Sequence, residues 1–394
     1  MISGLSMEQA LVWRCCRSVI ASTKDSAMPE LIGKIIHWDT LLNYARWHGV
    51  MPLLNQALAP HKAAMPSRVV EELTVAYVNA LKHNLFLASE LLKVLELFES
   101  HGIQAVPFKG IMLSACVYGN MAFHRASDLD ILVHREDVPR IKTLLAQAGY
   151  PPNKTLSAAQ EQALLKQRNE YHVLRLDGQC CLDIHWQMVY YFDSFLISTD
   201  DIWADLRTTR LSGRPVPTLS PEHLLLLLCI HGSNHCWYLL SMTCDLARAI
   251  MAHHTIAWDK ILARAERQGI KRMVLLGFRL AAQIMNIILP PAIQNSLFTD
   301  PRADRLAHTV INRLTNKRSF RLQRMRLMAF HLRVLSRTRD KIRYLFRILI
   351  TTSEKDWACC ALPRSLFALY IFIRPLRFCL DAWKQWRNRA SSRA

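Results

Sequence analysis

The stretch that decides the fold is Ser127-Asp128-Leu129-Asp130-Ile131-Leu132-Val133. Its apolar run predicts a buried strand, and because side chains alternate between the faces of a strand, Asp128 and Asp130 point the same way. Two carboxylates about 6–7 Å apart on one strand face are costly unless a positive charge lies between them, and a divalent cation commonly supplies it. Solvated strand ends also carry Asp-x-Asp, so the flanking sequence must decide between these two interpretations.

A phosphate-binding turn is predicted upstream of the acidic pair. The short apolar strand Val106-Pro107-Phe108 ends at Lys109-Gly110, and apolar residues at 112, 113, 116 and 117 then predict a helix. A glycine at such a turn lets a ligand approach the backbone, and the N–H groups of a helix start suit a phosphate. Lys109 adds a positive charge for the same anion. The alternative is a plain turn with a solvated lysine, and the acidic pair that follows favours the phosphate site.

A third carboxylate is predicted on a later hairpin. Residues 171–186 read as two strands joined by Asp177-Gly178, a strong hairpin signal. In the second strand one face is apolar and the other is polar, with Leu182, Ile184 and Trp186 on the first and Asp183 and His185 on the second. Counting outward from the turn pairs His172 with Asp183. Asp183 is therefore the candidate third carboxylate, and an Asp183–His172 pair that only satisfies itself is the alternative.

These motifs resemble those of an uncharacterised bacterial nucleotidyltransferase-like family within the DNA polymerase beta-type nucleotidyltransferase superfamily. The resemblance rests on Lys109-Gly110, Tyr118, Arg125, Asp128–Val133 and Leu182–Trp186. The superfamily motif is a Gly-Gly or Gly-Ser turn that opens a helix, an Asp-x-Asp or Asp-x-Glu strand, and a carboxylate on a later strand. Here Ile111 stands after Gly110 where the superfamily motif has a second glycine or a serine. The Lys-Gly form is similar to that of the narrower family.

The resemblance implies an α+β fold, with a small mixed-sheet nucleotidyltransferase-type domain embedded in predominantly helical segments. It also implies metal-dependent transfer of a nucleoside monophosphate from a nucleoside triphosphate to an unidentified hydroxyl acceptor. Relatives of this kind often accompany polysaccharide or peptide natural-product biosynthesis. The expected catalytic residues and ligands of Mg²⁺ or Mn²⁺ are Asp128, Asp130 and Asp183, and the expected nucleotide-binding residues are Lys109, Gly110 and Arg125. The alternative is a catalytically weak or silent module of the same fold that binds a nucleotide or a partner.

The rest of the chain reads as helical, and we expect four regions. These are an N-terminal helical segment over residues 1–84, the nucleotidyltransferase-like α/β domain over 85–210, a helical domain over 211–300 and a basic amphipathic tail over 301–394. His231 and His235 lie one turn apart on a predicted helix that starts at Pro221. Gly232 occupies the position where a zinc protease has its glutamate, so we do not expect a zinc site from this pair.

Composition limits the class of protein. With 394 residues, 51% of them hydrophobic, the chain can bury a sizeable core. Eleven cysteines, with three adjacent pairs and no Cys-x-x-Cys, argue for reduced thiols in a cytoplasmic protein. We expect no signal peptide, because no basic region is followed by a long apolar run at the N-terminus. We expect no transmembrane span, because no apolar run reaches about 18 residues.

Positive charge is concentrated at the C-terminal end. From residue 300 onward 22 Lys and Arg face 6 Asp and Glu, which gives +16 of the total formal charge of +19. Between Arg313 and Arg347 the basic residues alternate with apolar ones at helical spacing. Three interpretations are open: packing on the protein with a solvated basic face, attraction to an anionic membrane surface, and attraction to nucleic acid or another polyanion. We favour packing, with the basic face available to an anionic partner.

Overall fold

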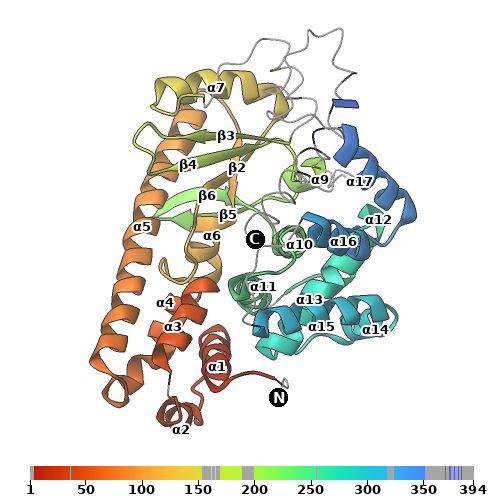
Figure 1. Cartoon of the computed structure of the whole chain (residues 1–394). Coiled ribbons are helices and arrows are strands. Elements are labelled where there is room, and N and C mark those ends of the chain that lie inside the picture. Colours follow the sequence, from red (N-terminus) through yellow and green to blue (C-terminus); the bar gives the residue numbers. More distant parts are fainter. Residues whose placement is uncertain are drawn as a thin grey trace.

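Two small sheets lie among many helices in the structure, a computed structural model (Figure 1). It describes residues 4–35, 37–152, 169–188, 199–253, 255–316 and 324–350, with a few single residues outside these ranges. The predicted α+β class is therefore confirmed. The four-stranded sheet is mixed, as expected, and it carries the acidic motifs.

The larger sheet has the strand order β1-β2-β4-β3. Its strands are β1 (Ala105–Phe108), β2 (Leu129–Val133), β3 (Glu170–Leu174) and β4 (Cys181–His185). β2 runs parallel to β4, and the other neighbouring pairs are antiparallel. The smaller sheet is a hairpin of β5 (Arg207–Leu211) and β6 (Arg214–Thr218). The strand predicted around Asp130 is β2, and all five of its residues are buried.

Helices precede, interrupt and follow the sheet. Before it lie α1 (Met7–Ala21), α2 (Met28–Gly33), α3 (Trp38–Trp47), α4 (Met51–Leu58), η1 (Ala59–Ala64) and α5 (Ser67–Ser100). Between its strands and the hairpin lie α6 (Gly110–Met112), η2 (Leu113–Tyr118), η3 (Arg135–Asp137), α7 (Val138–Gln147) and α9 (Thr199–Trp203). After the hairpin come α10 (Pro221–Asn234), α11 (Leu240–Ala252), α12 (Trp258–Gln268), α13 (Lys271–Met285), α14 (Pro291–Phe298), α15 (Pro301–Thr315), α16 (Arg324–Val334) and α17 (Thr338–Ile350).

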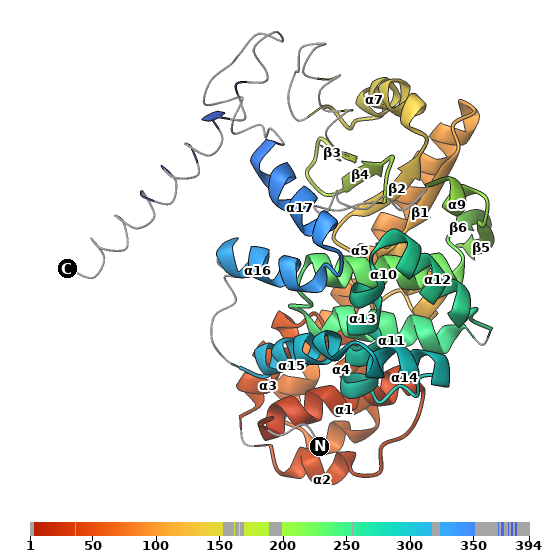
Figure 2. The same ribbon diagram turned by 90° about the vertical axis from the view of Figure 1, so that its right-hand side faces the viewer.

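The two faces of the larger sheet belong to different cores. Strand alternation sends Ile131 and Ile184 to one face, where they join Leu91 of the long helix α5 and Ile141 of α7 in one apolar cluster. On the opposite face, Leu132 belongs to the second core, which the N-terminal helices form with α10, α11 and α13 (Figure 2). The polar residues of β2 and β4 share that second face, so they lie between the sheet and these helices, which we call the helical body.

The segment after Lys109 differs from the predicted regular helix. Only Gly110–Met112 is α-helical, and Leu113–Tyr118 forms a π-helical turn that ends at Gly119 with a φ of +66°. The apolar spacing of the sequence does not distinguish a π-helical turn from an α-helix here, because either conformation would bury Leu113 and Val117, which are both buried in the structure. A π-turn inside a helix is frequent at functional sites.

The basic segment packs on the body over its described part. Phe330, Leu335 and Tyr344 are buried, and His331 lies 2.8 Å from the Tyr344 hydroxyl and 3.0 Å from the carbonyl oxygen of Asn234 in α10. Arg337 donates to the carbonyls of Glu266 and Arg267 at the C-terminal end of α12. Basic side chains near a helix C-terminus stabilise its unpaired carbonyls.

One part of the packing prediction is wrong. Packing of the whole basic tail predicts that its apolar residues Leu345, Phe346, Leu366, Tyr370 and Phe372 are buried. Leu345 and Phe346 are 40% and 58% exposed, and Phe372, a single described residue, is 69% exposed. The buried side of α17 is the one that carries Asp340 and Tyr344, so the opposite apolar side faces solvent. Leu366 and Tyr370 lie outside the described residues. Among the described helices, none is long and apolar enough to cross a membrane.

Candidate active site

The sheet register places two of the predicted carboxylates side by side. Asp130 on β2 is the register partner of Asp183 on the parallel strand β4. One ligand atom each from Asp130, Asp183 and His185 lie within 4.8 Å of one another. Oxygen and imidazole atoms at this separation can converge on a single cation.

Asp130 is a buried carboxylate with two cationic or polar partners. Its side chain is 4% exposed, and its Oδ1 accepts hydrogen bonds from Lys109 Nζ at 2.8 Å and from His185 Nε2 at 2.9 Å. Burial alone raises the pKa of this carboxyl group, but the Lys109 ammonium and His185 outweigh it and hold the pKa below its usual range. Asp130 is therefore ionised. Both hydrogen bonds end on Oδ1, which leaves Oδ2 as the atom for a cation.

Lys109 is held in a strained backbone conformation. Its φ of +59° is unusual for a residue with a side chain, and Gly110 follows with a φ of +40°. A Cβ on Gly110 would lie 3.2 Å from the carbonyl oxygen of Asp128 and 3.4 Å from Ala126 Cβ. Glycine is thus required here for the close approach of the loop that leads into β2. The predicted strand–turn–helix geometry around Gly110 is present, but the Lys109 ammonium contacts Asp130.

Asp183 lies at the centre of the polar face. Its Oδ1 is 2.5 Å from His172 Nδ1, the register partner that the hairpin turn predicts. Burial, followed by the charge of Asp130, raises the pKa of Asp183 against the opposing effects of His185 and His172. The carboxylate is therefore a stronger base than an exposed aspartate.

Asp128 lies just before β2 and is half-buried. Burial and the neighbouring Asp130 raise its pKa, while Lys109 opposes them, and the Ser127 hydroxyl donates to its Oδ1 at 2.9 Å. Asp128 precedes Asp130 by two residues in the chain, and its carboxylate is not among the ligand atoms that converge within 4.8 Å. Arg125 is exposed on the same loop. The metal-binding and nucleotide-binding roles of these residues stay predictions.

A buried asparagine, which the sequence reasoning missed, fixes the loop before β2. Asn84 of α5 is fully buried, and its Nδ2 donates to the carbonyls of Met121 and His124. Its Oδ1 accepts from the backbone N–H of Ala126 at 3.2 Å. The only signal in the sequence is a polar residue within an apolar helical stretch. Asn84 thereby links the long helix to the turn that positions Asp128.

The helical body also contacts this loop. Asp245 of α11 accepts a hydrogen bond from the Tyr118 hydroxyl at 2.9 Å and lies 3.1 Å from His124 Nδ1. Burial lowers the pKa of His124, but the Asp245 carboxylate outweighs it and raises the pKa. His231 and His235, whose rings lie 4.6 Å apart, both have pKa values lowered by burial and then by the Lys109 ammonium.

A cavity of about 310 Å³ opens beside Lys109. β1, the π-turn, the β5–β6 hairpin and the start of α10 surround it, with Phe108, Cys116, Arg207, Thr209 and Leu224 among its lining residues. Its size suits a small ligand. The mixture of apolar walls with hydroxyl and guanidinium groups allows it to hold part of a substrate.

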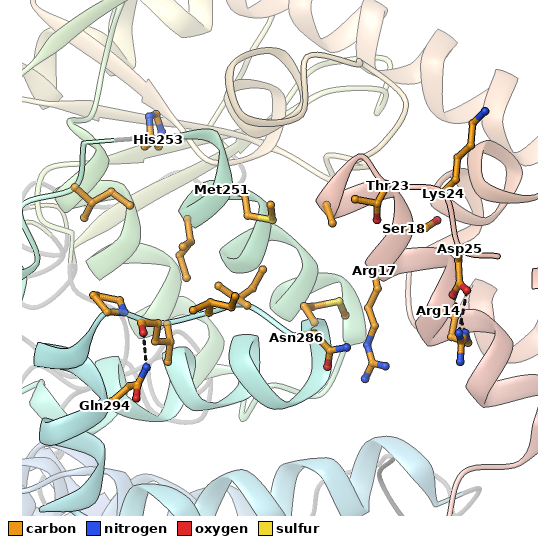
Figure 3. A pocket seen from close by; sticks show the side chains of 18 of the residues that line it. Arg14, Arg17, Ser18, Thr23, Lys24, Asp25, Met251, His253, Asn286 and Gln294 are labelled. Carbon is orange, nitrogen blue, oxygen red and sulfur yellow. Dashed lines mark hydrogen bonds and ion pairs between the residues drawn. The ribbon is translucent and has the colours of Figure 1, made fainter. Parts of the chain in front are cut away.

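A larger cavity of about 1110 Å³ lies between the end of α1 and the loop that joins α13 to α14. Figure 3 shows Arg14, Arg17 and Lys24 on one side of it and Asn286 and Gln294 on the other. Arg14 is paired with Asp25 at 2.7 Å, and Arg17 donates to the carbonyl of Ile284. None of the predicted site residues lines this cavity. His253 lines both cavities.

The comparison with protein families identifies a nucleotidyltransferase-like protein. Over residues 35–286 the chain matches the family described as uncharacterised nucleotidyltransferase, and it belongs to that family. The matched region runs from α3 to the end of α13, so it contains Lys109, Asp128, Asp130 and Asp183 but not the basic segment. No curated protein and no solved structure matches the chain.

Proposed function

We propose that this protein transfers a nucleoside monophosphate from a nucleoside triphosphate to a hydroxyl acceptor in a reaction that depends on Mg²⁺ or Mn²⁺. The observation that carries the proposal is the registered pair Asp130 and Asp183 on neighbouring parallel strands, beside the Lys109-Gly110 turn. Membership of a nucleotidyltransferase family supports it.

The donor set fits a hard divalent cation. Asp130 is an ionised carboxylate on the same polar sheet face as Asp183, and Asp128 precedes β2 with its pKa raised by burial and then by the charge of Asp130. Carboxylate oxygens are the ligands that Mg²⁺ and Mn²⁺ prefer. Asp128, Asp130 and Asp183 would hold the metal, which when bound neutralises the charge of the phosphates.

Side chains at and around the metal site bind the phosphates and accept the proton in the proposed reaction. Lys109 keeps Asp130 ionised, and Lys109, Gly110 and Arg125 bind the phosphates as the triphosphate enters. The acceptor oxygen forms a bond to the α-phosphorus while the bond from that phosphorus to the pyrophosphate oxygen breaks. Asp183, made more basic by burial, takes the acceptor proton, and pyrophosphate leaves.

A pyrophosphate-release screen across the nucleoside triphosphates with Mg²⁺, together with thermal-shift binding, tests this proposal. We expect one or more nucleotides to stabilise the wild type and to give slow, metal-dependent pyrophosphate release even with water as acceptor. Asp130→Asn should abolish release in a protein that still folds but is less stable, because the buried Lys109 ammonium loses its partner, while Asp177→Asn, on the exposed turn of the same hairpin, should leave release unchanged.

A binding module without turnover is the second candidate function. The Lys109 ammonium is bound to Asp130, and Ile111 stands where the superfamily motif has a second glycine or a serine, so the phosphate turn is weaker than in that motif. The same screen separates the two candidates, since a silent module shows nucleotide-dependent stabilisation with no pyrophosphate. The acceptor belongs to the hydroxyl-bearing compounds, and a precursor in polysaccharide or peptide natural-product biosynthesis fits the family resemblance.

The cysteines suggest the compartment in which the protein works. All eight cysteines that the structure describes are free thiols, which fits a reducing compartment such as the cytoplasm.

The basic segment suggests a surface that the protein binds. On α17 the exposed side chains Ile342, Leu345 and Phe346 share one helical face beside Lys341 and Arg343. We propose that this face, and not a nucleic-acid site, binds an anionic membrane surface, because apolar side chains insert between lipid headgroups while cations pair with them.

Co-sedimentation with vesicles tests the membrane proposal. The wild type should bind vesicles that contain anionic lipid and should not bind neutral vesicles. Phe346→Asp should release it, whereas Leu85→Asp, a substitution of a similarly exposed apolar residue on α5, should not. Equal binding by both variants, or binding to nucleic acid in place of vesicles, would remove the proposal.

A further inference from the structure

The polar face of the larger sheet carries further side chains that can coordinate a metal, in addition to the predicted carboxylates. Cys181, Asp183 and His185 alternate along β4 and therefore share that face. Across the sheet Asp183 is flanked by its two register partners, Asp130 on β2 and His172 on β3. The result is a cross of five side chains with Asp183 at its centre.

Two arms of this cross, His172 and Cys181, converge with the central Asp183 independently of Asp130. With Nδ1 taken as the ligand atom of His172, the Cys181 sulfur lies 3.4 Å from that nitrogen and 3.9 Å from Asp183 Oδ1, and Nδ1 lies 2.5 Å from the same oxygen. The ligand atoms of these three residues all lie within 4.8 Å of one another. Edges of a tetrahedral zinc site are about 3.3–3.8 Å for bond lengths of about 2.0–2.3 Å. The two separations that involve the sulfur are close to that edge length, whereas His172 Nδ1 and Asp183 Oδ1 are hydrogen-bonded and must move apart when a metal binds.

From this convergence we infer that His172, Cys181 and Asp183 form a binding site for Zn²⁺, separate from the magnesium-type site but sharing Asp183 with it. A thiolate, an imidazole and a carboxylate leave the fourth tetrahedral position for water or an incoming ligand. As the zinc–sulfur bond forms, the thiol proton leaves to solvent. Sulfur and nitrogen ligands favour zinc over magnesium, so the two sites differ in the ion that they select.

The surroundings allow a metal to enter. The His172 side chain is 57% exposed, so its ring can rotate away from the hydrogen bond with Asp183 and turn a nitrogen toward the ion. Cys181 is half-buried. The neighbouring Cys180 is buried on the opposite side of the chain, where it belongs to the apolar cluster with Tyr150. Of the adjacent cysteine pair, only Cys181 belongs to the ligand set.

Cobalt substitution in the full-length protein is the direct test, because Co²⁺ occupies zinc sites and a thiolate ligand gives it a near-ultraviolet charge-transfer band. We expect the band in the wild type, its loss on adding one equivalent of Zn²⁺, and its absence in Cys181→Ser. His172→Gln should weaken zinc binding at least about tenfold, the smallest effect expected even for a residue that only supports a ligand. Cys180→Ser is the matched control and should retain the band, as should Cys116→Ser.

A wild type without the band, or a band that persists in Cys181→Ser, would overturn the zinc site. This readout needs no nucleotide, so it stands whether or not the protein is a transferase. If the proposed transfer reaction is also correct, zinc engages Asp183 and should inhibit Mg²⁺-dependent pyrophosphate release. Cys181→Ser should then resist that inhibition at zinc concentrations that stop the wild type.

Discussion

Lys109 and Asp130 form a buried ion pair, with 2.8 Å between Nζ and Oδ1 and both side chains less than 10% exposed. The two residues meet because β1 and β2 are antiparallel, with Phe108 opposite Asp130. The lysine that the sequence marks for phosphate binding is thus also the counter-ion of a predicted metal ligand. A cation that enters this site would compete with Lys109 for Asp130, and a triphosphate would compete with Asp130 for Lys109.

Removing the Lys109 side-chain charge should show how strongly the stability of the protein depends on the Lys109–Asp130 pair. Lys109→Met leaves an uncompensated buried carboxylate, so we expect a loss of about 3–5 kcal/mol in stability, measured as a lower urea midpoint. The double variant Lys109→Met/Asp130→Leu should recover much of the loss, because neither charge then remains. A double variant no more stable than Lys109→Met would show that the pair is not the cause.

Lys109 should also contribute to nucleotide affinity. Lys109→Ala is expected to weaken triphosphate binding by about 1–3 kcal/mol, the range for a hydrogen bond to a charged group. Isothermal titration with Mg²⁺ present measures the difference. Equal affinities for the wild type and the variant would confine Lys109 to its structural contact with Asp130.

Asn84 should matter for activity although it lies outside the carboxylate cluster. Asn84→Ala removes its side-chain hydrogen bonds to the loop that carries Asp128, and each buried partner left unpaired costs about 1–3 kcal/mol. We expect a lower melting temperature and a larger loss in the rate of transfer than in nucleotide affinity. Thr74→Ala, on an exposed turn of the same helix, serves as the control.

Acid should loosen the packing of the basic segment. Burial lowers the pKa of His331 to about 4, against an opposing hydrogen bond to Asn234 and with a further lowering by His235. The unfolded state, with a pKa near 6.5, binds more protons between pH 6.5 and 4, so stability is complete above pH 6.5 and falls as the pH approaches 4. His48 and His223, also lowered to about 4, act in the same direction.

The loss from His331 alone amounts to at most about 3 kcal/mol. Melting temperatures at pH 7.5 and 5 measure it, and His331→Gln should show a smaller difference between the two pH values. An unchanged difference in the variant would mean that other groups cause the acid sensitivity.

Truncation distinguishes a packed segment from a detachable one. A chain that ends at residue 316 loses Phe330, Leu335 and Tyr344 from the core, so we expect lower solubility and a lower melting temperature. A soluble fragment 1–316 with unchanged thermal stability would contradict the packing and would make residues after 316 a separate electrostatic arm.

The sequence was most informative where local rules determine geometry. Strand alternation and the Asp177-Gly178 turn were enough to predict β2, the β3–β4 hairpin and the pairing of His172 with Asp183, because a tight turn sets the register. The parallel pairing of β2 with β4, which aligns Asp130 with Asp183, depends on segments far apart in the chain and could only be expected from the family resemblance.

Contacts between residues that are far apart in the chain could not be predicted from the sequence. Nothing local shows that Lys109 reaches Asp130, that Asn84 holds the loop before β2, or that Asp245 binds His124. Over the described residues the basic segment forms α16 and α17 with some buried side chains, but its amphipathic pattern did not show which side of α17 is buried. Tyr344 and Asp340 decide that side, through contacts with α12 and α16.

Direct binding of Mn²⁺, followed by electron paramagnetic resonance, tests most directly whether Asp130 and Asp183 form one metal site. The full-length wild type should bind Mn²⁺, and more tightly when a nucleoside triphosphate is present. Asp130→Asn and Asp183→Asn should each lose that binding, while Asp177→Asn should keep it. A wild type that binds no Mn²⁺ with or without nucleotide, or Asp130→Asn and Asp183→Asn variants that bind it as the wild type does, would contradict the proposed active site.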